Sequence, residues 1–214
     1  MSLVIDWLFP KNCFGCHKGN KYLCNLCESN ITTGSLTQKN SFEGIISIYK
    51  YDGIMKVIVE KIKYGYVSDA VEEMAELMGK KLKLNYPNVV NYWQEKKYIL
   101  VSIPLYWQRK NWRGFNQSEL LAYYLAKVLN LKYEGELLVR KIKTKNQATI
   151  KNRQVRRKNI INVFEVNKNM VTRENVILID DVITSGATMT AALRTLKDFG
   201  VSQVWGLSLC GVQK

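Results

Sequence analysis

The sequence predicts an α/β fold in which helices flank a parallel sheet, preceded by a short cysteine-rich segment. From Tyr98 onward, apolar stretches typical of strands alternate with amphipathic helical patterns, which is the layout of a doubly wound sheet. Four of the five cysteines fall within fifteen residues, at positions 13–27. The 214 residues, 47% hydrophobic and 23% charged, suffice for one ordinary domain with a small appendage. We therefore expect a separate segment at 1–35 and a main domain at 36–214.

The first part of the main domain has the patterns of one strand and two helices. Alternating residues rich in isoleucine and tyrosine predict a strand at Ile45–Tyr51. A helix with apolar residues at helical spacing opens at Gly53, and a second amphipathic helix covers Ser68–Leu84. Pro87 and the asparagines around it end that second helix. The region 52–86 is thus expected to be a helical lead-in to the core.

The core is expected at 98–214, where strands and helices alternate. Asn116, with a glutamate three residues later, has the pattern of a capping box, which predicts a helix that runs to Leu129. Val176–Ile179 is continuously apolar, as expected for a central strand of a parallel sheet that is covered on both faces. The remaining predicted elements are strands at Tyr98–Ile103, Leu137–Lys141, Asn162–Val166 and Gln203–Cys210, and a helix at Thr188–Phe199 that ends at Gly200.

The clustered cysteines predict a structural zinc site. They form two CxxC pairs, made by Cys13, Cys16, Cys24 and Cys27. Four thiolates at this spacing are the ligands of a tetrahedral zinc ion, and Gly15 and Gly19 permit the tight turns that such pairs require. Because a segment this short has no core of its own, metal binding would supply most of its folding free energy.

Three other uses of the cysteines fit the sequence less well. Cys13–His17 matches the attachment string of c-type haem, but haem attachment would leave the second CxxC pair unexplained. A thioredoxin-type redox pair expects a strand before it and a helix after it, and neither pattern is present. Disulfides are disfavoured in the cytosol, where we expect the protein because its N-terminus lacks the features of a secretory signal. The fifth cysteine, Cys210, ends an apolar run, which indicates a small buried side chain.

The charge of the chain is strongly positive and unevenly placed. Lysine and arginine number 32 against 18 aspartates and glutamates, a formal net charge of +14. The stretch Arg140–Lys158 holds nine basic residues and no acidic one. Such a face suits a polyanion, either a nucleic acid or a compact phosphate ligand. The alternative is a solvated surface, which explains an excess of charge but explains less well nineteen residues without an acid.

The candidate site is the string from Val176 to Thr188. Asp180 and Asp181 follow the buried strand, at the sheet edge where open α/β proteins bind ligands. Two adjacent carboxylates there can accept hydrogen bonds from a vicinal diol such as that of ribose, or hold a metal through water. The loop that follows leads into a helix N-terminus, whose N–H groups and hydroxyls suit a monophosphate, and Gly186 lets the backbone approach it closely. The string therefore predicts a ribose-5-phosphate site.

Two simpler interpretations account for less of this string. A Walker B strand also ends an apolar run in acidic residues, but no GxxxxGK[ST] loop precedes it in the sequence. A plain strand–turn–helix connection would explain the glycine in the loop. It would not explain two acids placed next to three residues with hydroxyl groups.

The string resembles the phosphoribosyl pyrophosphate (PRPP) motif of type I phosphoribosyltransferases. Further stretches, together with the cysteine pairs, resemble the ComF family of competence proteins over nearly the whole chain. These stretches are Leu8–Pro10, Ile62–Tyr64, Val101–Leu105, Arg113–Ala122, Gln147, Arg153–Asn159 and Phe164. The resemblance implies a type I phosphoribosyltransferase-like parallel sheet flanked by helices, with an N-terminal four-cysteine zinc-binding segment.

The resemblance also implies roles for individual residues. Asp180 and Asp181 would be the catalytic pair and would hold the ribose hydroxyls. Mg²⁺ would arrive bound to PRPP, whose pyrophosphate would lie against the Pro104–Leu105 turn and Arg113–Gly114. The residues implied in PRPP binding are Asp180, Asp181, Ile183, Thr184, Ser185, Gly186, Ala187, Thr188, Pro104, Leu105, Arg113 and Gly114.

Two functions are compatible with such a site. The first, implied by the resemblance, is a cytosolic protein of natural transformation that binds PRPP–Mg and single-stranded DNA and works with a competence helicase or other DNA-uptake proteins. The second is an active phosphoribosyltransferase, a pentosyl transferase that displaces pyrophosphate from PRPP with an unidentified nucleophile. No stretch approaches the ~18 to 20 apolar residues of a membrane span, so no membrane insertion is expected. The residues expected to contact DNA phosphates are Arg140, Lys151, Arg153, Arg156, Arg157 and Lys158.

Overall fold

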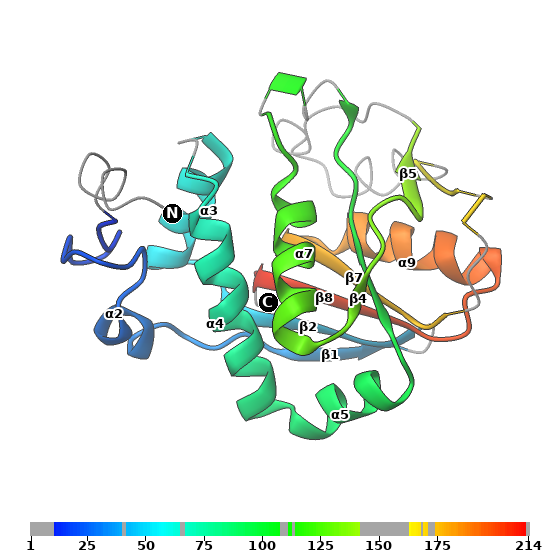
Figure 1. Ribbon diagram of the computed structural model, residues 1–214, viewed down its shortest axis with the longest axis horizontal. Helices are drawn as coiled ribbons and strands as arrows, with labels where there is room; N and C mark the ends of the chain where they lie inside the picture. The colour runs from blue at the N-terminus through cyan, green and yellow to red at the C-terminus, as the bar shows by residue number, and fades with distance from the viewer. Residues whose placement is uncertain are drawn as a thin grey trace.

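The protein is built around a sheet whose six described strands are mostly parallel (Figure 1). The computed structural model describes residues 11–39, 42–64, 67–107, 111–112, 114–141, 163–167, 169–170 and 174–212. The strands are β1 (Leu36–Lys39), β2 (Phe42–Lys50), β3 (Ile99–Ser102), β4 (Lys132–Tyr133), β7 (Val176–Ile183) and β8 (Val204–Gly211). Their order is β1–β2–β8–β7–β3–β4, and only the β1–β2 pair is antiparallel. The predicted α/β class is therefore confirmed.

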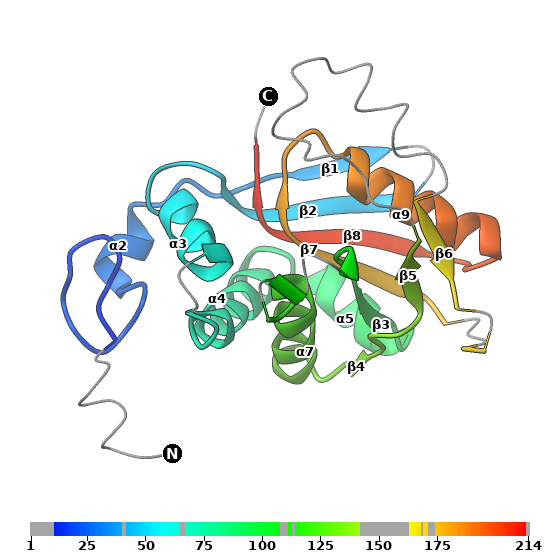
Figure 2. The ribbon, with the colours of Figure 1, turned by 90° about the horizontal axis from the view of Figure 1, so that it is seen from above.

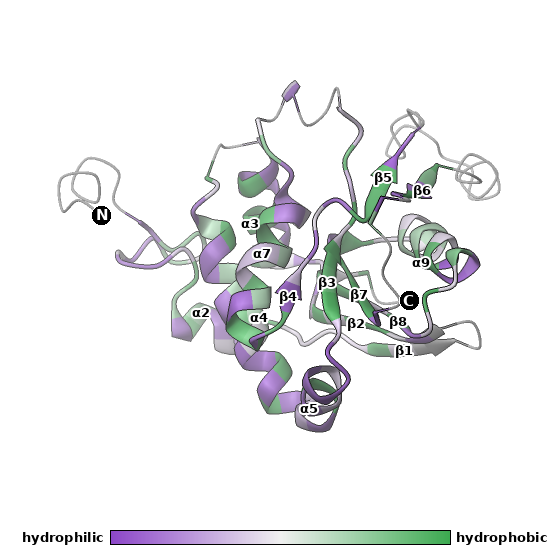
Figure 3. Ribbon diagram, turned by 45° about the vertical axis from the view of Figure 1, so that its right-hand side comes forward, coloured by the Kyte–Doolittle hydropathy of each residue, from purple (hydrophilic) through white to green (hydrophobic). Residues whose placement is uncertain are grey.

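Helices cover both faces of the sheet, as the view from above shows (Figure 2). The long helices are α3 (Gly53–Tyr64), α4 (Ala70–Asn85), α5 (Pro87–Glu95) and α7 (Gln117–Leu129) on one face, and α9 (Ala187–Phe199) on the other. Along β7, Ile177 and Ile179 belong to the first core and Val176 and Leu178 to the second. Successive side chains of a strand point to opposite faces, so a strand buried on both must be apolar throughout. This confirms β7 as the central strand, and Figure 3 shows the same hydrophobic character in β3.

A small antiparallel ribbon lies beside α9. Its strands are β5 (Leu138–Arg140) and β6 (Phe164–Val166), with Leu138 paired to Val166 and Arg140 to Phe164. Leu138, Phe164 and Val166 are buried in the same core as the inner face of α9. The two short strands predicted around the basic stretch are therefore present and pair with each other.

The region after α4 differs from the prediction. The helix does end before Pro87, at Asn85, but the proline then begins a further helix, α5, where the sequence predicts only a stop. Proline suits the first turn of a helix because the N–H group it lacks would have no partner there. Trp93 of α5 is completely buried and packs edge-on against Trp205 of β8, with ring centroids 5.6 Å apart. The asparagine-rich segment thus covers the sheet.

Two edge strands and part of the central strand also differ from the predicted elements. β1 and β4 are short strands at opposite edges of the sheet, and the sequence predicts neither. β7 continues four residues beyond Ile179, through both aspartates, to Ile183. Among the described residues, no helix combines the length and the apolar character needed to cross a membrane.

Candidate functional site

Asp180 and Asp181 lie in the final part of β7, between the parallel strands β8 and β3. The sequence predicts them just beyond the strand, but Asp180 still pairs with Ser208 of β8 in the ladder. Asp181 is only 8% exposed and points to the face covered by α3 and α7, as its contacts show. The two carboxylates therefore belong to the rigid sheet at its carboxyl-terminal edge.

Asp181 is held by side chains from two different helices. Its Oδ2 atom lies 2.7 Å from Nζ of Lys63 at the end of α3 and accepts a hydrogen bond from Nε2 of Gln117, at the start of α7, at 3.1 Å. Its Oδ1 atom accepts the N–H group of Val182 at 2.8 Å. Burial alone would raise the pKa of Asp181, but Lys63 and these hydrogen bonds hold it below its ordinary value. Asp181 is therefore an ionised carboxylate.

Asp180 has a different environment. Its Oδ1 atom accepts hydrogen bonds from Oγ of Ser118 at 3.1 Å and from the N–H group of Asp181 at 2.9 Å. Burial and the neighbouring negative charge of Asp181 raise the pKa of Asp180 to about 7, although Lys63 and Ser118 act in the opposite sense. The pair thus combines one fixed negative charge with one group that gains or loses a proton near neutral pH.

Lys63 was not among the predicted site residues. It follows Ile62 on the buried side of α3, and only 21% of its side chain is exposed. Burial alone would lower its pKa, but the charges of Asp181 and Asp180 raise it above the ordinary lysine value. The available signal was the Ile62–Tyr64 stretch of the family resemblance, which marks this lysine without giving it a partner. Gln117 and Ser118 likewise lie in a matching stretch of the resemblance, which indicates no role for them.

The loop after β7 leads directly into the thirteen-residue helix α9. Gly186 has φ = +72°, a left-handed conformation that favours glycine, and its carbonyl accepts the N–H group of Thr190 in the first helical turn. A Cβ atom at Gly186 would meet only Ile183, at 3.9 Å, so backbone conformation and not crowding within the chain explains the glycine. Thr184 is exposed, and Ser185, Ala187 and Thr188 are partly exposed. The loop therefore presents a helix N-terminus to solvent next to the aspartates.

A second loop, after β3, borders the same edge. Ile103 donates its N–H group to the carbonyl of Ile179 on β7, and the partly exposed Pro104 and Leu105 follow it. Asn116 ties the loop closed, because Nδ2 donates to the carbonyl of Ile103 at 3.2 Å while Oδ1 caps α7 through the N–H group of Ser118. The predicted helix start at Asn116 is confirmed. Gly114 is exposed with φ = +80°, and Arg113 lies outside the described residues.

The four N-terminal cysteines come together as the sequence predicts. Their Sγ atoms all lie within 4.8 Å of one another, and those of Cys16 and Cys24 are 3.6 Å apart. Zinc–sulfur bonds of about 2.3 Å place tetrahedral thiolates roughly 3.8 Å apart, so the cluster fits a zinc ion. Burial alone would raise the pKa of Cys13, but nearby N–H groups, including that of Cys24, lower it to about 6. The donor set is suited to binding a metal ion.

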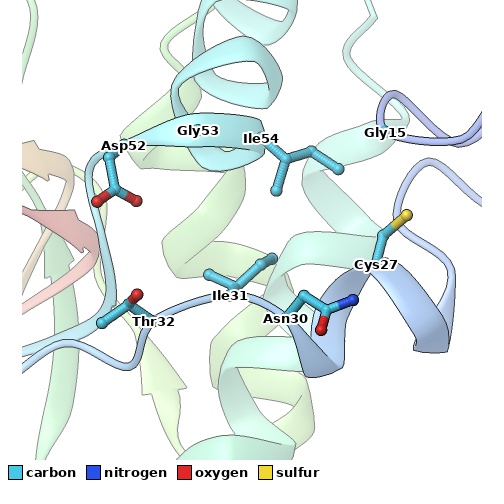
Figure 4. A pocket seen from close by; sticks show the side chains of 8 residues that line it. All are labelled: Gly15, Cys27, Asn30, Ile31, Thr32, Asp52, Gly53 and Ile54. Carbon is cyan, nitrogen blue, oxygen red and sulfur yellow. The ribbon is translucent and has the colours of Figure 1, made fainter.

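The turns around this cluster use different residues from those expected. His17 and Asn20 have positive φ angles, 59° and 80°, where the sequence predicts that glycines supply the tight turns. Gly15 serves close packing instead, because a Cβ atom there would lie 2.5 Å from Cδ1 of Ile54 and 2.9 Å from Sγ of Cys27. Figure 4 shows Gly15, Cys27 and Ile54 among the residues that line a hollow between the cysteine segment and the start of α3. The volume of this hollow is about 260 Å³.

The cysteine segment, which includes α2 (Asn25–Ser29), is firmly attached to the main domain. The N–H groups of Tyr22 and Leu23 donate to the carboxylate of Glu73 on α4 at 3.0 and 2.8 Å. Glu28 of α2 accepts a hydrogen bond from the buried hydroxyl of Tyr49 on β2. Leu23 is 1% exposed and belongs to the larger core. The segment is too short to form a core of its own, and it packs into the core that covers the sheet.

The structure describes only the first two residues of the basic stretch, Arg140 and Lys141. Arg140 lies at the end of β5, partly exposed, with its guanidinium 5.5 Å from the ring centre of Phe164. The other residues expected to contact DNA, Lys151, Arg153, Arg156, Arg157 and Lys158, lie outside the described residues. Cys210, by contrast, is completely buried as predicted.

Residues 116–210 match the family described as phosphoribosyl transferase domain. DNA utilization protein YhgH from Escherichia coli K12 is 27% identical over 210 residues, which cover 94% of this chain and 90% of that protein. Competence protein F from Haemophilus influenzae is 27% identical over 92% of this chain and 89% of its own length. Competence protein ComFC from Bacillus subtilis is 27% identical, covering 83% of this chain and 65% of its own.

Among solved structures, the chain is similar to glutamine PRPP amidotransferase from B. subtilis, complexed with ADP and GMP. The TM-score is 0.43 at 15% sequence identity, and the similarity covers 67% of this chain and 26% of that one.

Proposed function

We propose that the chain is a ComF-like protein that binds PRPP–Mg and single-stranded DNA in the cytoplasm during DNA uptake. It is homologous to competence and DNA utilization proteins over most of its length and contains a phosphoribosyl transferase domain. The observation that carries the proposal is the pair Asp180–Asp181. It lies at the carboxyl edge of the sheet, between a closed loop and a helix N-terminus. This arrangement suits a phosphorylated sugar, because carboxylates accept hydrogen bonds from sugar hydroxyls and a helix N-terminus favours a phosphate.

The aspartates would bind the ribose of PRPP through its 2′ and 3′ hydroxyl groups. Asp181 is kept ionised by Lys63 and is oriented by Gln117, so its oxygens are fixed acceptors. Asp180 is positioned by Ser118 on the same helix. Hydroxyl-to-carboxylate hydrogen bonds are stronger than those between neutral groups, and acceptors positioned beforehand lose little entropy when the ligand binds.

The phosphate groups would occupy the two flanking loops. The 5′-phosphate suits the loop from Thr184 to Thr188, because N–H groups at the start of a long helix and nearby hydroxyls favour an anion. The pyrophosphate would lie against Pro104–Leu105 and Gly114, with Arg113 supplying positive charge. Mg²⁺ bound with PRPP would offset the remaining negative charge of the pyrophosphate.

The DNA-binding part of the proposal rests on the relatives and on charge. The relatives are named for competence and DNA utilization, and this chain carries a net charge of +14. Arg140–Lys158, with nine basic residues and no acid, would contact the phosphates of a single strand. A competence helicase or another DNA-uptake protein would deliver or receive that strand.

A second candidate function is transfer of the phosphoribosyl group, and the unequal protonation of the aspartates favours it. In this reaction an acceptor nucleophile forms a bond to C1 of the ribose. The bond from C1 to the pyrophosphate oxygen breaks, and pyrophosphate leaves with the electron pair. Asp181, which stays ionised, would stabilise positive charge that develops on the ribose ring.

Calorimetric titration of PRPP with Mg²⁺ tests the sugar site. We expect saturable binding to the wild type, loss of binding in Asp180→Asn/Asp181→Asn, and unchanged binding in Asp198→Asn, an exposed aspartate on α9. A folded, metal-loaded wild type that binds no PRPP would contradict this part of the proposal. Release of pyrophosphate when candidate acceptors are added would then separate transfer from binding alone.

Single-stranded DNA binding is tested with Arg156→Glu/Arg157→Glu, measured by fluorescence anisotropy at several salt concentrations. We expect weaker DNA binding with a shallower salt dependence, while PRPP binding persists. The control with the same charge change is Lys80→Glu/Lys96→Glu. Lys80 is an exposed lysine on α4, and Lys96 is an exposed lysine directly after α5. Equal losses in both variants would mean that net charge, and not the basic stretch, determines binding.

A further inference from the structure

Two exposed aromatic rings from different segments of the chain lie together. Tyr64, the last residue of α3, is 59% exposed, and Trp112, in the loop between β3 and α7, is 65% exposed. Their ring centroids are 6.2 Å apart and the ring planes meet at 58°. Large aromatic side chains in a soluble protein are usually more buried than this, so an exposed pair marks a contact surface.

Both rings are joined through short pieces of chain to the groups that hold Asp181. Tyr64 directly follows Lys63, whose Nζ atom lies 2.7 Å from that carboxylate. Trp112 comes five residues before Gln117, whose Nε2 atom donates to the same oxygen at 3.1 Å. Figure 1 shows α3 and the loop that leads into α7 at the same end of the molecule. The aromatic pair is therefore close along the chain to both side chains that hold Asp181.

The surrounding sequence is basic. Lys61, three residues before Tyr64, is exposed, and the sequence 108–114 around Trp112 contains two arginines and one lysine but no acid, although these three basic residues lie outside the described part of the chain. Aromatic rings interleaved with positive charges are the surface that single-stranded nucleic acid selects, because bases stack on the rings while phosphates meet the cations. An apolar protein partner would not require these charges.

We infer that Tyr64 and Trp112 form a stacking platform for a nucleobase next to the PRPP site. The inference rests on the proposed function and extends it. It assigns the group that would face the ribose to a nucleobase, and it does so with residues that do not belong to the basic stretch 140–158. The same chemistry is offered by a base within a single strand and by a free nucleoside. The experiment therefore distinguishes these two sources.

The test compares binding of a labelled dT12 oligonucleotide, an abasic strand of the same length, and free thymidine and adenosine. The variants are Trp112→Ala, Tyr64→Ala and the conservative Trp112→Phe and Tyr64→Phe. We expect each alanine variant to weaken dT12 binding about tenfold or more, and the phenylalanine variants to stay close to wild type. PRPP binding, measured by calorimetry, should stay unchanged in all four, which also shows that they are folded.

Trp107→Ala is the matched control, because Trp107 is a 57% exposed tryptophan of the same loop that packs on Tyr106 instead of Tyr64. The abasic strand should bind all variants equally, since it offers phosphates without bases. Competition by thymidine or adenosine would assign the platform to a small nucleoside, and competition by strands alone would assign it to DNA.

The inference is overturned if wild type fails to bind dT12, if both alanine variants bind it like wild type, or if Trp107→Ala loses as much affinity as Trp112→Ala. Loss of abasic-strand binding in parallel with dT12 would also overturn it, because the rings would then act only through charge or folding. A wild type that binds dT12 through these rings but binds no PRPP would instead contradict the proposed sugar site and leave the platform in place.

Discussion

The cysteine segment and the acid pair are both held by charged side chains from neighbouring helices, but the two attachments differ in kind. Glu73 of α4 accepts hydrogen bonds from two backbone N–H groups, those of Tyr22 and Leu23. Lys63 of α3 meets another ionised side chain, Asp181, at the sheet edge. The first attachment satisfies backbone groups and can persist whatever binds elsewhere. The second places charged side chains at the sheet edge, where the proposed ligand would bind.

Loss of the cysteine ligands should have the largest effect on the molecule. We expect Cys13→Ser/Cys24→Ser to abolish metal binding and lower the free energy of unfolding by more than about 3 kcal/mol, because structural zinc supplies about 10–16 kcal/mol in isolated zinc-finger peptides. Metal analysis and chemical denaturation measure both effects. Cys210→Ala, at a buried cysteine outside the cluster, should retain about one zinc per chain. Equal stability of the cysteine double variant and wild type would show that Glu73 and the shared core hold the segment without metal.

Breaking the Lys63–Asp181 pair should come next. Removal of one partner from a buried pair typically costs about 3–5 kcal/mol, because the other charge is left without a partner. We expect Lys63→Met and Asp181→Asn each to reduce stability by about 3 kcal/mol, and the double variant to lose much less than the sum. Urea denaturation of all four proteins completes the cycle. Additive losses would mean that the two side chains are not coupled.

The pKa of Asp180 is raised, whereas that of Asp181 is lowered. The stability that Asp180 contributes should therefore fall as the pH rises. Its folded-state pKa is raised to about 7, above the unfolded value of about 3.9, so its contribution to stability is present below about pH 4 and is lost as pH rises through 7. Asp180→Asn should therefore stabilise the protein more at pH 8 than at pH 5.5, by about 1 kcal/mol or more, since one pKa unit corresponds to about 1.4 kcal/mol. Unfolding free energies at the two pH values test this. A gain that does not depend on pH would contradict the raised pKa.

The last prediction compares the two glycines at the ends of α9. Gly186 before the helix and Gly200 after it both have positive φ angles, 72° and 105°. Replacement of either by alanine should cost about 1–2 kcal/mol of stability through the left-handed backbone alone. Only Gly186→Ala should also weaken PRPP binding, because Gly186 belongs to the proposed phosphate loop. Calorimetry and thermal unfolding of both variants separate the two effects, and equal PRPP affinity in both would remove this loop from the site.

Most of the sheet and of the helices that cover it could be predicted, because the strands are apolar and the helices are amphipathic. The run Val176–Ile179 specified a strand buried on both faces, and the sheet bears this out. The strands β1 and β4 lie at the edges, where pairing to a neighbour and not local pattern determines the conformation. The helix α5 was missed because a proline can end one helix and begin the next, and local sequence does not distinguish these roles.

The candidate site was predictable in composition but not in contacts. The aspartates and the loop after them are contiguous in the sequence, so their chemistry could be inferred directly. Lys63 and Gln117 come from distant segments, and only the folded chain brings them to Asp181. Likewise, the cysteine spacing indicates a metal site. The hydrogen bond that attaches this segment to Glu73, however, joins residues that are fifty positions apart in the sequence. Long-range pairing of charges leaves no local periodicity from which to infer it.

The position of β8 has a consequence for the order in which the chain can assemble. β8 follows every other described strand in the sequence, yet it lies between β2 and β7 and pairs with both. During synthesis, the β1–β2 hairpin and the β3–β7 half therefore cannot join until residues 204–211 have left the ribosome. Until then, one edge of β7 and one edge of β2 are open to other chains, so the nascent protein depends on rapid insertion of β8 to avoid misassembly.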